Sequence, residues 1–142
     1  MDELEQVRLN LAYMNITNLQ NTITRMAENS YRIKLFYIAT VSAIFTYLIA
    51  NSKLNFLFTL IPTIIFLLLD AYYLSLEKHF INVHNKTIKD ISDQNLLEAI
   101  YFTSPKNFNN GMNFIKAFGS PSIYIFYGFF LALHFVYFYL GK

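Results

Sequence analysis

Asp70 raises the clearest chemical question in this chain, because it is the one acidic residue within a long hydrophobic window. A carboxylate in such a window is costly and usually has a partner. Arg32 and Lys34 enter the neighbouring hydrophobic window at the same depth. The sequence therefore predicts an intramembrane ion pair between Asp70 and these cations, or an interfacial cap. A proton or cation site is the alternative interpretation.

The residue types do not indicate a metal site or a catalytic site. There is no cysteine, which excludes thiolate metal sites and Cys nucleophiles. His79 and His84 are five residues apart rather than four, and no acidic third ligand accompanies them. His134 stands alone, which is typical of packing. No nucleophile and base, Gly-rich loop or pair of intramembrane carboxylates occurs. We expect no catalytic residue, metal or cofactor, and no enzyme activity.

Three hydrophobic stretches are long enough to cross a bilayer, which takes about 20 mostly apolar residues. They lie at about residues 35–50, 54–76 and 121–140. The chain of 142 residues is 55% hydrophobic and 14% charged, against roughly 25% charged in soluble domains. Ser120 and Pro121 suit the N-cap and first turn of the third stretch. The sequence thus predicts an all-α membrane protein with three transmembrane helices.

The distribution of basic residues predicts the orientation. Nine of the eleven lie before the first span or in the segment 77–119, and only Lys53 and Lys142 lie on the other side. Basic residues favour the cytoplasmic side. We therefore expect a multi-pass protein of the bacterial inner membrane, with a cytoplasmic N-terminus, a cytoplasmic segment 77–119 and an outside C-terminus.

The N-terminal region predicts a long cytoplasmic amphipathic helix that continues into the first span, because no Pro or Gly lies between Asp2 and Lys53. Residues 1–31 would form this helix, for oligomerisation and gating, and residues 32–142 the transmembrane domain. One apolar stripe needs a partner helix; it consists of Leu9, Ala12, Ile16, Leu19, Ile23 and Met26. Alternatively, the helix lies on the membrane or on the middle segment.

A second stripe changes character along the same helix. It begins with four apolar residues, which we interpret as a gate: Leu4, Val7, Leu11 and Met14. A polar vestibule follows, made by Asn18, Asn21 and Arg25. Within the first span the same face shows Thr40, Ala43, Tyr47 and Ala50, the candidate pore-lining residues. Several copies around an axis would enclose a pore. Close helix packing at Ala39, Ala43 and Ala50 is the alternative.

Two stretches carry a resemblance to a known family. They are Leu69-Asp70-Ala71-Tyr72-Tyr73-Leu74 with Leu76-Glu77-Lys78, and Phe118-Gly119-Ser120-Pro121-Ser122 leading to Phe126-Tyr127. They resemble small multi-span membrane channel effectors of bacterial anti-phage defence, of the Hailong type, which are paired with a nucleotidyltransferase-like protein. The resemblance covers the three spans but no motif in the N-terminal helix. It implies an oligomeric channel that opens on a nucleotide or oligonucleotide signal and depolarises the infected cell, as in abortive infection.

We expect three kinds of partner: the lipid bilayer, further copies of the chain, and the nucleotidyltransferase-like protein with its nucleotide or oligonucleotide product. For the copies, a tetramer is the working assumption. On charge alone, five cytoplasmic residues could contact phosphate; they are Arg25, Lys78, Lys86, Lys89 and Lys106. Their simpler interpretation is positive-inside topology. Two other functions stay open: a non-conducting membrane anchor that docks a cytoplasmic partner through the N-terminal helix, and a holin-like toxin.

Overall fold

The computed structural model describes residues 3–50, 57–92, 97, 100 and 110–140, and all its elements are α-helices. The first helix, α1, runs unbroken through Glu3–Ala50. Its 48 residues span about 72 Å, far more than a membrane requires. Glu3 and Glu5 lie in its first turn, where acidic side chains favour the positive end of the helix dipole. The boundary expected between residues 31 and 32 falls inside this continuous helix.

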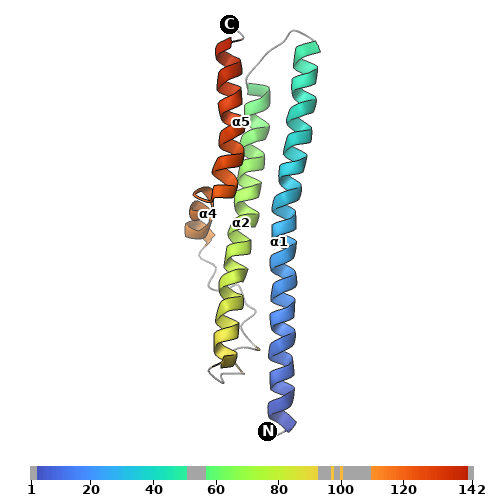
Figure 1. Cartoon of the computed structure of the whole chain (residues 1–142), viewed down its shortest axis with the longest axis vertical. Helices are drawn as coiled ribbons and strands as arrows, with labels where there is room; N and C mark the ends of the chain where they lie inside the picture. The colour runs from blue at the N-terminus through green and yellow to red at the C-terminus, as the bar shows by residue number, and fades with distance from the viewer. Residues whose placement is uncertain (1–2, 51–56, 93–96, 98–99, 101–109, 141–142) are drawn as a thin grey trace.

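The second helix, α2, covers Leu57–Ser92 and runs antiparallel to α1 (Figure 1). It continues well past the end of the expected second span. The N-terminal part of α1 therefore has a long partner within the same chain. The helices α1 and α2 are in extensive contact, and they form one long hairpin (Figure 1).

The last two helices are α4, Asn110–Phe118, and α5, Pro121–Leu140. Between them, the Ser120 amide donates a hydrogen bond to the Ala117 carbonyl at 3.0 Å. The Ser120 carbonyl accepts from the amides of Ile123 and Tyr124 at 3.0 and 3.1 Å. This is the N-terminal geometry that Ser120 and Pro121 predicted. Both α4 and α5 contact α2, whereas α1 and α5 make no close backbone contact within the described residues.

The core lies where α1, α2 and α5 meet, around the completely buried ring of Tyr37. Four aromatic rings surround it at centroid distances of 5.0 to 5.8 Å; they belong to Phe66, Phe126, Tyr127 and Phe130. Edge-to-face contacts of this kind add to the gain from burial. The core therefore joins α5 to α1 through side chains rather than through close backbone approach.

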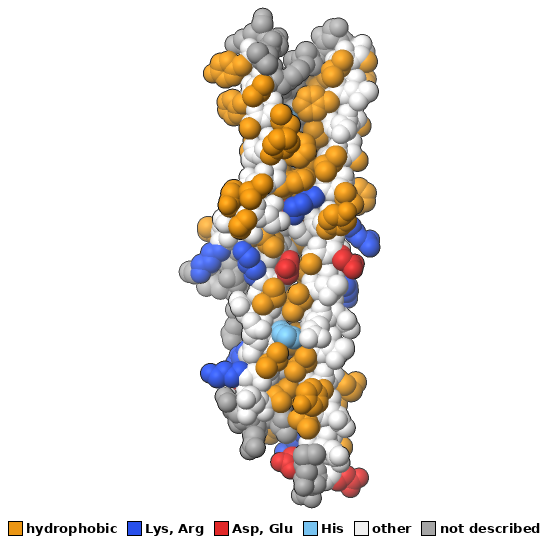
Figure 2. Space-filling view, viewed as in Figure 1, with side chains coloured by type: hydrophobic (Ala, Val, Ile, Leu, Met, Phe, Trp, Pro, Cys, Tyr) orange, Lys and Arg blue, Asp and Glu red, His pale blue; other side chains and the backbone are white. Residues whose placement is uncertain are grey.

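Much apolar surface remains outside this core. Two helices, α1 and α2, are long and apolar enough to cross a membrane, and α5 contains a shorter apolar stretch. Only 17% of the most apolar window of α1 and 33% of that of α2 is buried inside the chain. A core helix of a soluble protein would bury most of such a window. Figure 2 shows hydrophobic side chains most densely toward the end of α5, above several basic side chains at mid-height, and it shows further hydrophobic side chains below them.

Candidate functional site

Asp70 is completely buried in α2 and contacts two residues of α1. The Lys34 Nζ lies 2.7 Å from its Oδ2, and the Ser30 hydroxyl donates to its Oδ1 at 2.5 Å. Lys34 also donates to the Ser30 Oγ at 3.0 Å, so the three side chains form a closed cluster. Lys34 is the ion-pair partner of Oδ2. The lysine therefore compensates the buried carboxylate.

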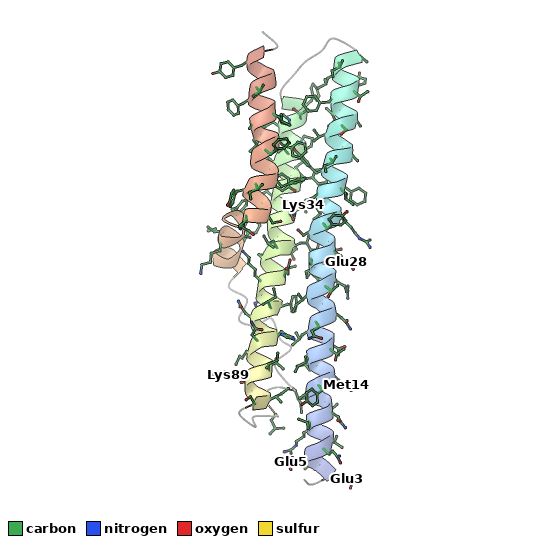
Figure 3. All side chains as sticks on the ribbon, viewed as in Figure 1. Glu3, Glu5, Met14, Glu28, Lys34 and Lys89 are labelled. Carbon is green, nitrogen blue, oxygen red and sulfur yellow. The ribbon has the colours of Figure 1, made fainter. Side chains whose placement is uncertain are left out.

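Arg32, the other expected partner of Asp70, lies elsewhere, and that part of the prediction is wrong. Its guanidinium is 4.0 Å from the Glu28 carboxylate on the same helix, and both side chains are exposed. Ser30 and Lys34 are four residues apart and share the face of α1 that meets α2. Arg32 is two residues from each of them, on the opposite face. Figure 3 shows Lys34 between the helices and Glu28 on the outer side of α1.

Two buried tyrosine hydroxyls extend the polar contacts deeper into the helix bundle. The Thr63 hydroxyl donates to the Thr59 carbonyl at 2.7 Å, so its oxygen accepts a hydrogen bond from the Tyr37 hydroxyl at 3.1 Å. The Tyr127 hydroxyl donates to the Phe66 carbonyl at 3.2 Å. The sequence analysis missed these contacts. Polar side chains within hydrophobic windows were the only available indication, and nothing in their spacing pairs them.

The candidate gate residues are exposed on α1. Leu4, Val7, Leu11 and Met14 are between 45% and 61% exposed. Met14 lies on the side of α1 that faces away from α2 (Figure 3). The candidate vestibule residues, Asn18, Asn21 and Arg25, are also exposed. Of the candidate pore-lining residues, Ala43, Tyr47 and Ala50 are exposed and Thr40 is half-buried.

The other N-terminal stripe faces α2. Ala12 and Leu19 are buried, and the remaining members, Leu9, Ile16, Ile23 and Met26, are half-buried. On the extension of α2, Val83, Thr87 and Asp90 are buried. The partner helix that this stripe requires is thus the second helix of the same chain. Within a single chain, α2 covers the stripe with Ala12 and Leu19, whereas the candidate gate residues remain exposed.

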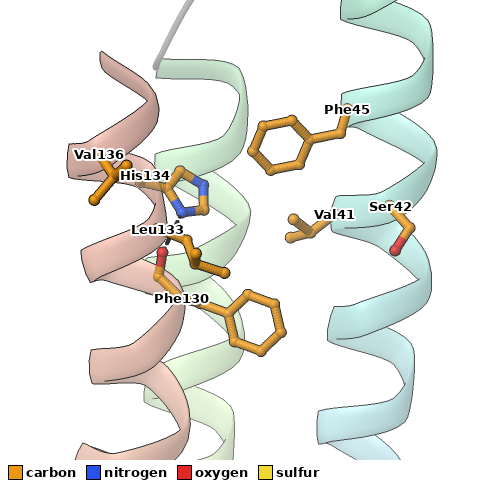
Figure 4. A pocket seen from close by; sticks show the side chains of 7 residues that line it. All are labelled: Val41, Ser42, Phe45, Phe130, Leu133, His134 and Val136. Carbon is orange, nitrogen blue, oxygen red and sulfur yellow. Dashed lines mark hydrogen bonds between the residues drawn. The ribbon is translucent and has the colours of Figure 1, made fainter. Parts of the chain in front are cut away.

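Two hollows flank the C-terminal half of α1. One, of about 580 Å³, lies between α1 and α5 (Figure 4). Its lining is mostly apolar and comprises Val41, Ser42, Phe45, Phe130, Leu133, His134 and Val136. The His134 Nδ1 lies 2.6 Å from the Phe130 carbonyl, to which it donates if protonated there. The second hollow, of about 310 Å³, includes the candidate pore-lining residues Ala43 and Tyr47.

Neither of the two hollows is lined by the candidate phosphate-contacting residues that the structure describes. Arg25 is exposed on α1, and Lys78, Lys86 and Lys89 are exposed on α2, while Lys106 lies outside the described residues.

The charges of Lys34 and Lys78 act on the carboxyl group of Glu77. Burial raises the pKa of this carboxyl group, and Lys34 and Lys78 oppose that rise. Burial also lowers the pKa of His79.

Among the residues that the structure describes, no group of three or more His, Cys, Asp or Glu side chains is placed to bind a metal ion. Comparisons with models of protein families, with curated proteins and with solved structures gave no match to the chain.

Proposed function

We propose that the chain is a homo-oligomeric, ligand-gated ion channel of the bacterial inner membrane, in which α1 of each copy faces the central axis. The observation that carries this proposal is the difference between the exposed faces of the three helices. On α1 the exposed side of the proposed membrane segment combines five small or hydroxyl-bearing residues, Ala39, Ser42, Ala43, Thr46 and Ala50, with five larger ones, Leu35, Phe36, Ile38, Tyr47 and Ile49. The run of small residues distinguishes α1 from α2. Small residues and hydroxyls are typical of helix contacts and pore walls rather than of lipid-facing surfaces.

The exposed faces of α2 and α5 differ from this pattern. On α2 they carry large aliphatic side chains, including Ile61, Ile64 and Leu68. On α5 they carry Ile125 and Phe129 among other large apolar side chains. Such side chains suit contact with lipid chains. We therefore place α2 and α5 toward the bilayer and α1 toward the other copies.

Exposed tyrosines support the three-span arrangement. On α5, which we place toward the bilayer, Tyr124 and Tyr139 are exposed and lie 15 residues apart, a rise of about 22 Å. Tyr is enriched at both interfaces of a bilayer whose apolar core is about 30 Å thick. With the basic residues inside, the N-terminus is cytoplasmic and the C-terminus is outside.

In the assembled channel, the exposed face of α1 would form three zones. Leu4, Val7, Leu11 and Met14 would make apolar rings at the cytoplasmic tip, which block ions by dewetting. Asn18, Asn21 and Arg25 would line a hydrated vestibule. The small residues within the membrane would form an uncharged neck. Each zone is already exposed in the single chain.

The proposed role is that of an anti-phage effector that depolarises the cell on a nucleotide signal, made by a nucleotidyltransferase-like partner. This part of the proposal is supported by the family resemblance. Arg25, Lys86 and Lys89 are exposed in the proposed cytoplasmic region and could contact phosphate groups there.

Cross-linking tests the arrangement of copies, because the native chain has no cysteine. Ala43→Cys and Leu11→Cys should each form disulfide-linked dimers between copies in native membranes under mild oxidation. Ile64→Cys, which is 49% exposed on α2, is the matched control and should stay monomeric. Cross-linking at Ile64→Cys but not at the α1 positions would reverse the assignment of faces.

Ion flux tests conduction itself. Liposomes that contain the purified chain with Leu11→Asn should release a potassium gradient, as followed with a potential-sensitive dye. Liposomes with the native chain should hold the gradient. If the α1 cysteines cross-link but no variant conducts, the non-conducting anchor becomes the better explanation of the exposed N-terminal stripe.

A further inference from the structure

Two lysines from different helices flank the contact between α2 and α4. Ala71 and Leu74 of α2 belong to the same core cluster as Ala117 of α4. Lys78 continues the helix face of Ala71 and Leu74, and Lys116 is the neighbour of Ala117. Lys116 is exposed on α4, and Lys78 is exposed on α2, against which α4 packs. The ion pairs of Lys34 and Arg32 do not include Lys78 or Lys116. The half-buried Glu77 feels the charge of Lys78 but is not paired with it. The positive charge of this surface is therefore not neutralised within the described chain.

Apolar side chains border the same surface. On α4, Phe114, Ala117 and Phe118 pack toward the core cluster, whereas Ile115 is 70% exposed. At the start of α5, Tyr124 is 57% exposed. A soluble phosphate ion makes only polar contacts, so binding of such an ion does not account for an exposed isoleucine beside the lysines. An apolar edge beside two lysines is what a phospholipid requires, with its chains on one side and its phosphate on the other.

Height along α2 separates Lys78 from the other lysines of that helix. Tyr72, which is 48% exposed, marks the bilayer interface on α2. Lys78 follows by six residues, or about 9 Å, within reach of the headgroup layer. Lys86 and Lys89 follow by 14 and 17 residues, or about 21 and 25 Å, and lie beyond that layer.

We infer that Lys78 and Lys116 together bind the phosphate of an anionic phospholipid headgroup in the cytoplasmic leaflet, with Ile115 inserted among the adjacent acyl chains. This inference rests on the membrane placement proposed above, but it does not depend on conduction. It assigns Lys78 to the membrane surface rather than to a soluble nucleotide. Bound lipid would hold α4 at the interface and fix the entry of α5 into the membrane.

Tryptophan fluorescence tests the inference at one position, because the native chain has no tryptophan. The full chain with Ile115→Trp is reconstituted into mixed bilayers in which either phosphatidylglycerol or phosphatidylcholine is brominated, and bromine quenches nearby tryptophan. We expect a roughly two- to five-fold preference for phosphatidylglycerol at this position. The preference should weaken as salt is raised. It should disappear in the Lys78→Gln/Lys116→Gln variant.

Two controls make the test specific. Phe129→Trp, at a lipid-facing position of α5 that is 60% exposed, should be quenched equally by both lipids. Lys86→Gln/Lys89→Gln in the Ile115→Trp chain should keep the preference. Helical content and quenching at Phe129→Trp verify that each glutamine variant is folded and inserted, and either single glutamine variant should lose part of the preference.

Four results would overturn the inference. They are equal quenching by both lipids at Ile115→Trp, a preference that survives loss of both lysines, a preference that millimolar inorganic phosphate abolishes, and equal loss of preference in the Lys86→Gln/Lys89→Gln variant. If neither lipid quenched Phe129→Trp, the membrane placement and the proposed function would fail together. A normal lipid preference in a chain that never conducts would leave the inference standing and reject only the channel.

Discussion

At the scale of single residues, the buried polar groups concentrate where α1, α2 and α5 meet. Asp70 and Lys34 are the buried charges there, and Ser30 bonds to both. Such a pair contributes little over well-packed apolar residues, but the loss of one partner leaves an uncompensated charge. The cluster therefore fixes the register of α1 against α2 more than it adds to stability.

Asp70→Asn should destabilise the chain by about 3 kcal/mol, because Lys34 is only 15% exposed and loses its counter-ion. Thermal unfolding in detergent and the yield of folded protein measure this loss. The double variant Asp70→Asn/Lys34→Gln should recover part of it, since no buried charge remains. Glu28→Gln removes only the exposed pair with Arg32 and should leave the midpoint unchanged. Normal assembly of Asp70→Asn with altered ion selectivity would instead make Asp70 a permeation residue.

Tyr37→Phe should cost about 1 kcal/mol, because it removes the hydrogen bond to Thr63 and keeps the aromatic contacts. Tyr37→Ala should cost about 3–5 kcal/mol, because it also leaves a cavity among the four surrounding rings. Tyr31→Phe, at a side chain that is 63% exposed, is the matched control and should have little effect. Unfolding midpoints of the three variants test this prediction, and equal shifts at positions 37 and 31 would argue against the core described here.

At the scale of elements, α1 has two faces with different tasks. The face with Ala12 and Leu19 is buried against α2, and the face with Leu11 and Met14 remains exposed. Because one helix carries both, the hairpin can fold in a single chain while the second face stays open for the contacts with other copies that we propose. Substitutions on the two faces should therefore fail in different ways.

Leu11→Asn or Met14→Asn should produce a leaky channel that depolarises cells without any activating signal, because a polar ring admits water. A dye-based measurement of membrane potential, at matched membrane expression, detects the leak. Ile16→Asn is the matched control: Ile16 is half-buried toward α2, so this variant should impair folding and assembly instead. If both polar gate variants assemble and stay electrically silent, with or without the activating signal, the stripe is not a gate.

At the scale of the whole molecule, the described structure places the end of α1 and the C-terminus at one end and the N-terminus at the other (Figure 1). Hydrophobic side chains are densest toward the C-terminal end, and several basic side chains lie at mid-height (Figure 2). This arrangement is compatible with the proposed division into a membrane part and a cytoplasmic stalk. In that proposal, the stalk comprises the N-terminal half of α1 and the extension of α2.

Cysteine labelling in intact cells measures the orientation. Cysteines that replace Ser52 and Gly141 should react with an impermeant maleimide, because the distribution of basic residues predicts that both lie outside. Cysteines at Asn18 and Asn109 should react only after the cells are permeabilised, which serves as the labelling control. Labelling of Asn18→Cys from outside would overturn the orientation and the channel built on it.

The sequence by itself determined the helical class, the unbroken course of α1 and the start of α5, because these depend on local properties. The lack of Pro and Gly predicted continuity, and Ser120 with Pro121 predicted a helix start. The need of Asp70 for a cation followed from the cost of a charge in an apolar window. The three-span topology and the channel remain predictions.

Only the tertiary structure decided which partners meet. By sequence, Arg32 and Lys34 lie at equivalent depths. The rotation of α1 about its axis turns Lys34 toward Asp70, with which it forms an ion pair, and leaves Arg32 beside Glu28. The two stripes of α1 were alike in spacing, and the antiparallel extension of α2 buried one and left the other exposed. Periodicity defines the faces of a helix, but it does not state which face another helix covers, because that depends on contacts between residues far apart in the chain.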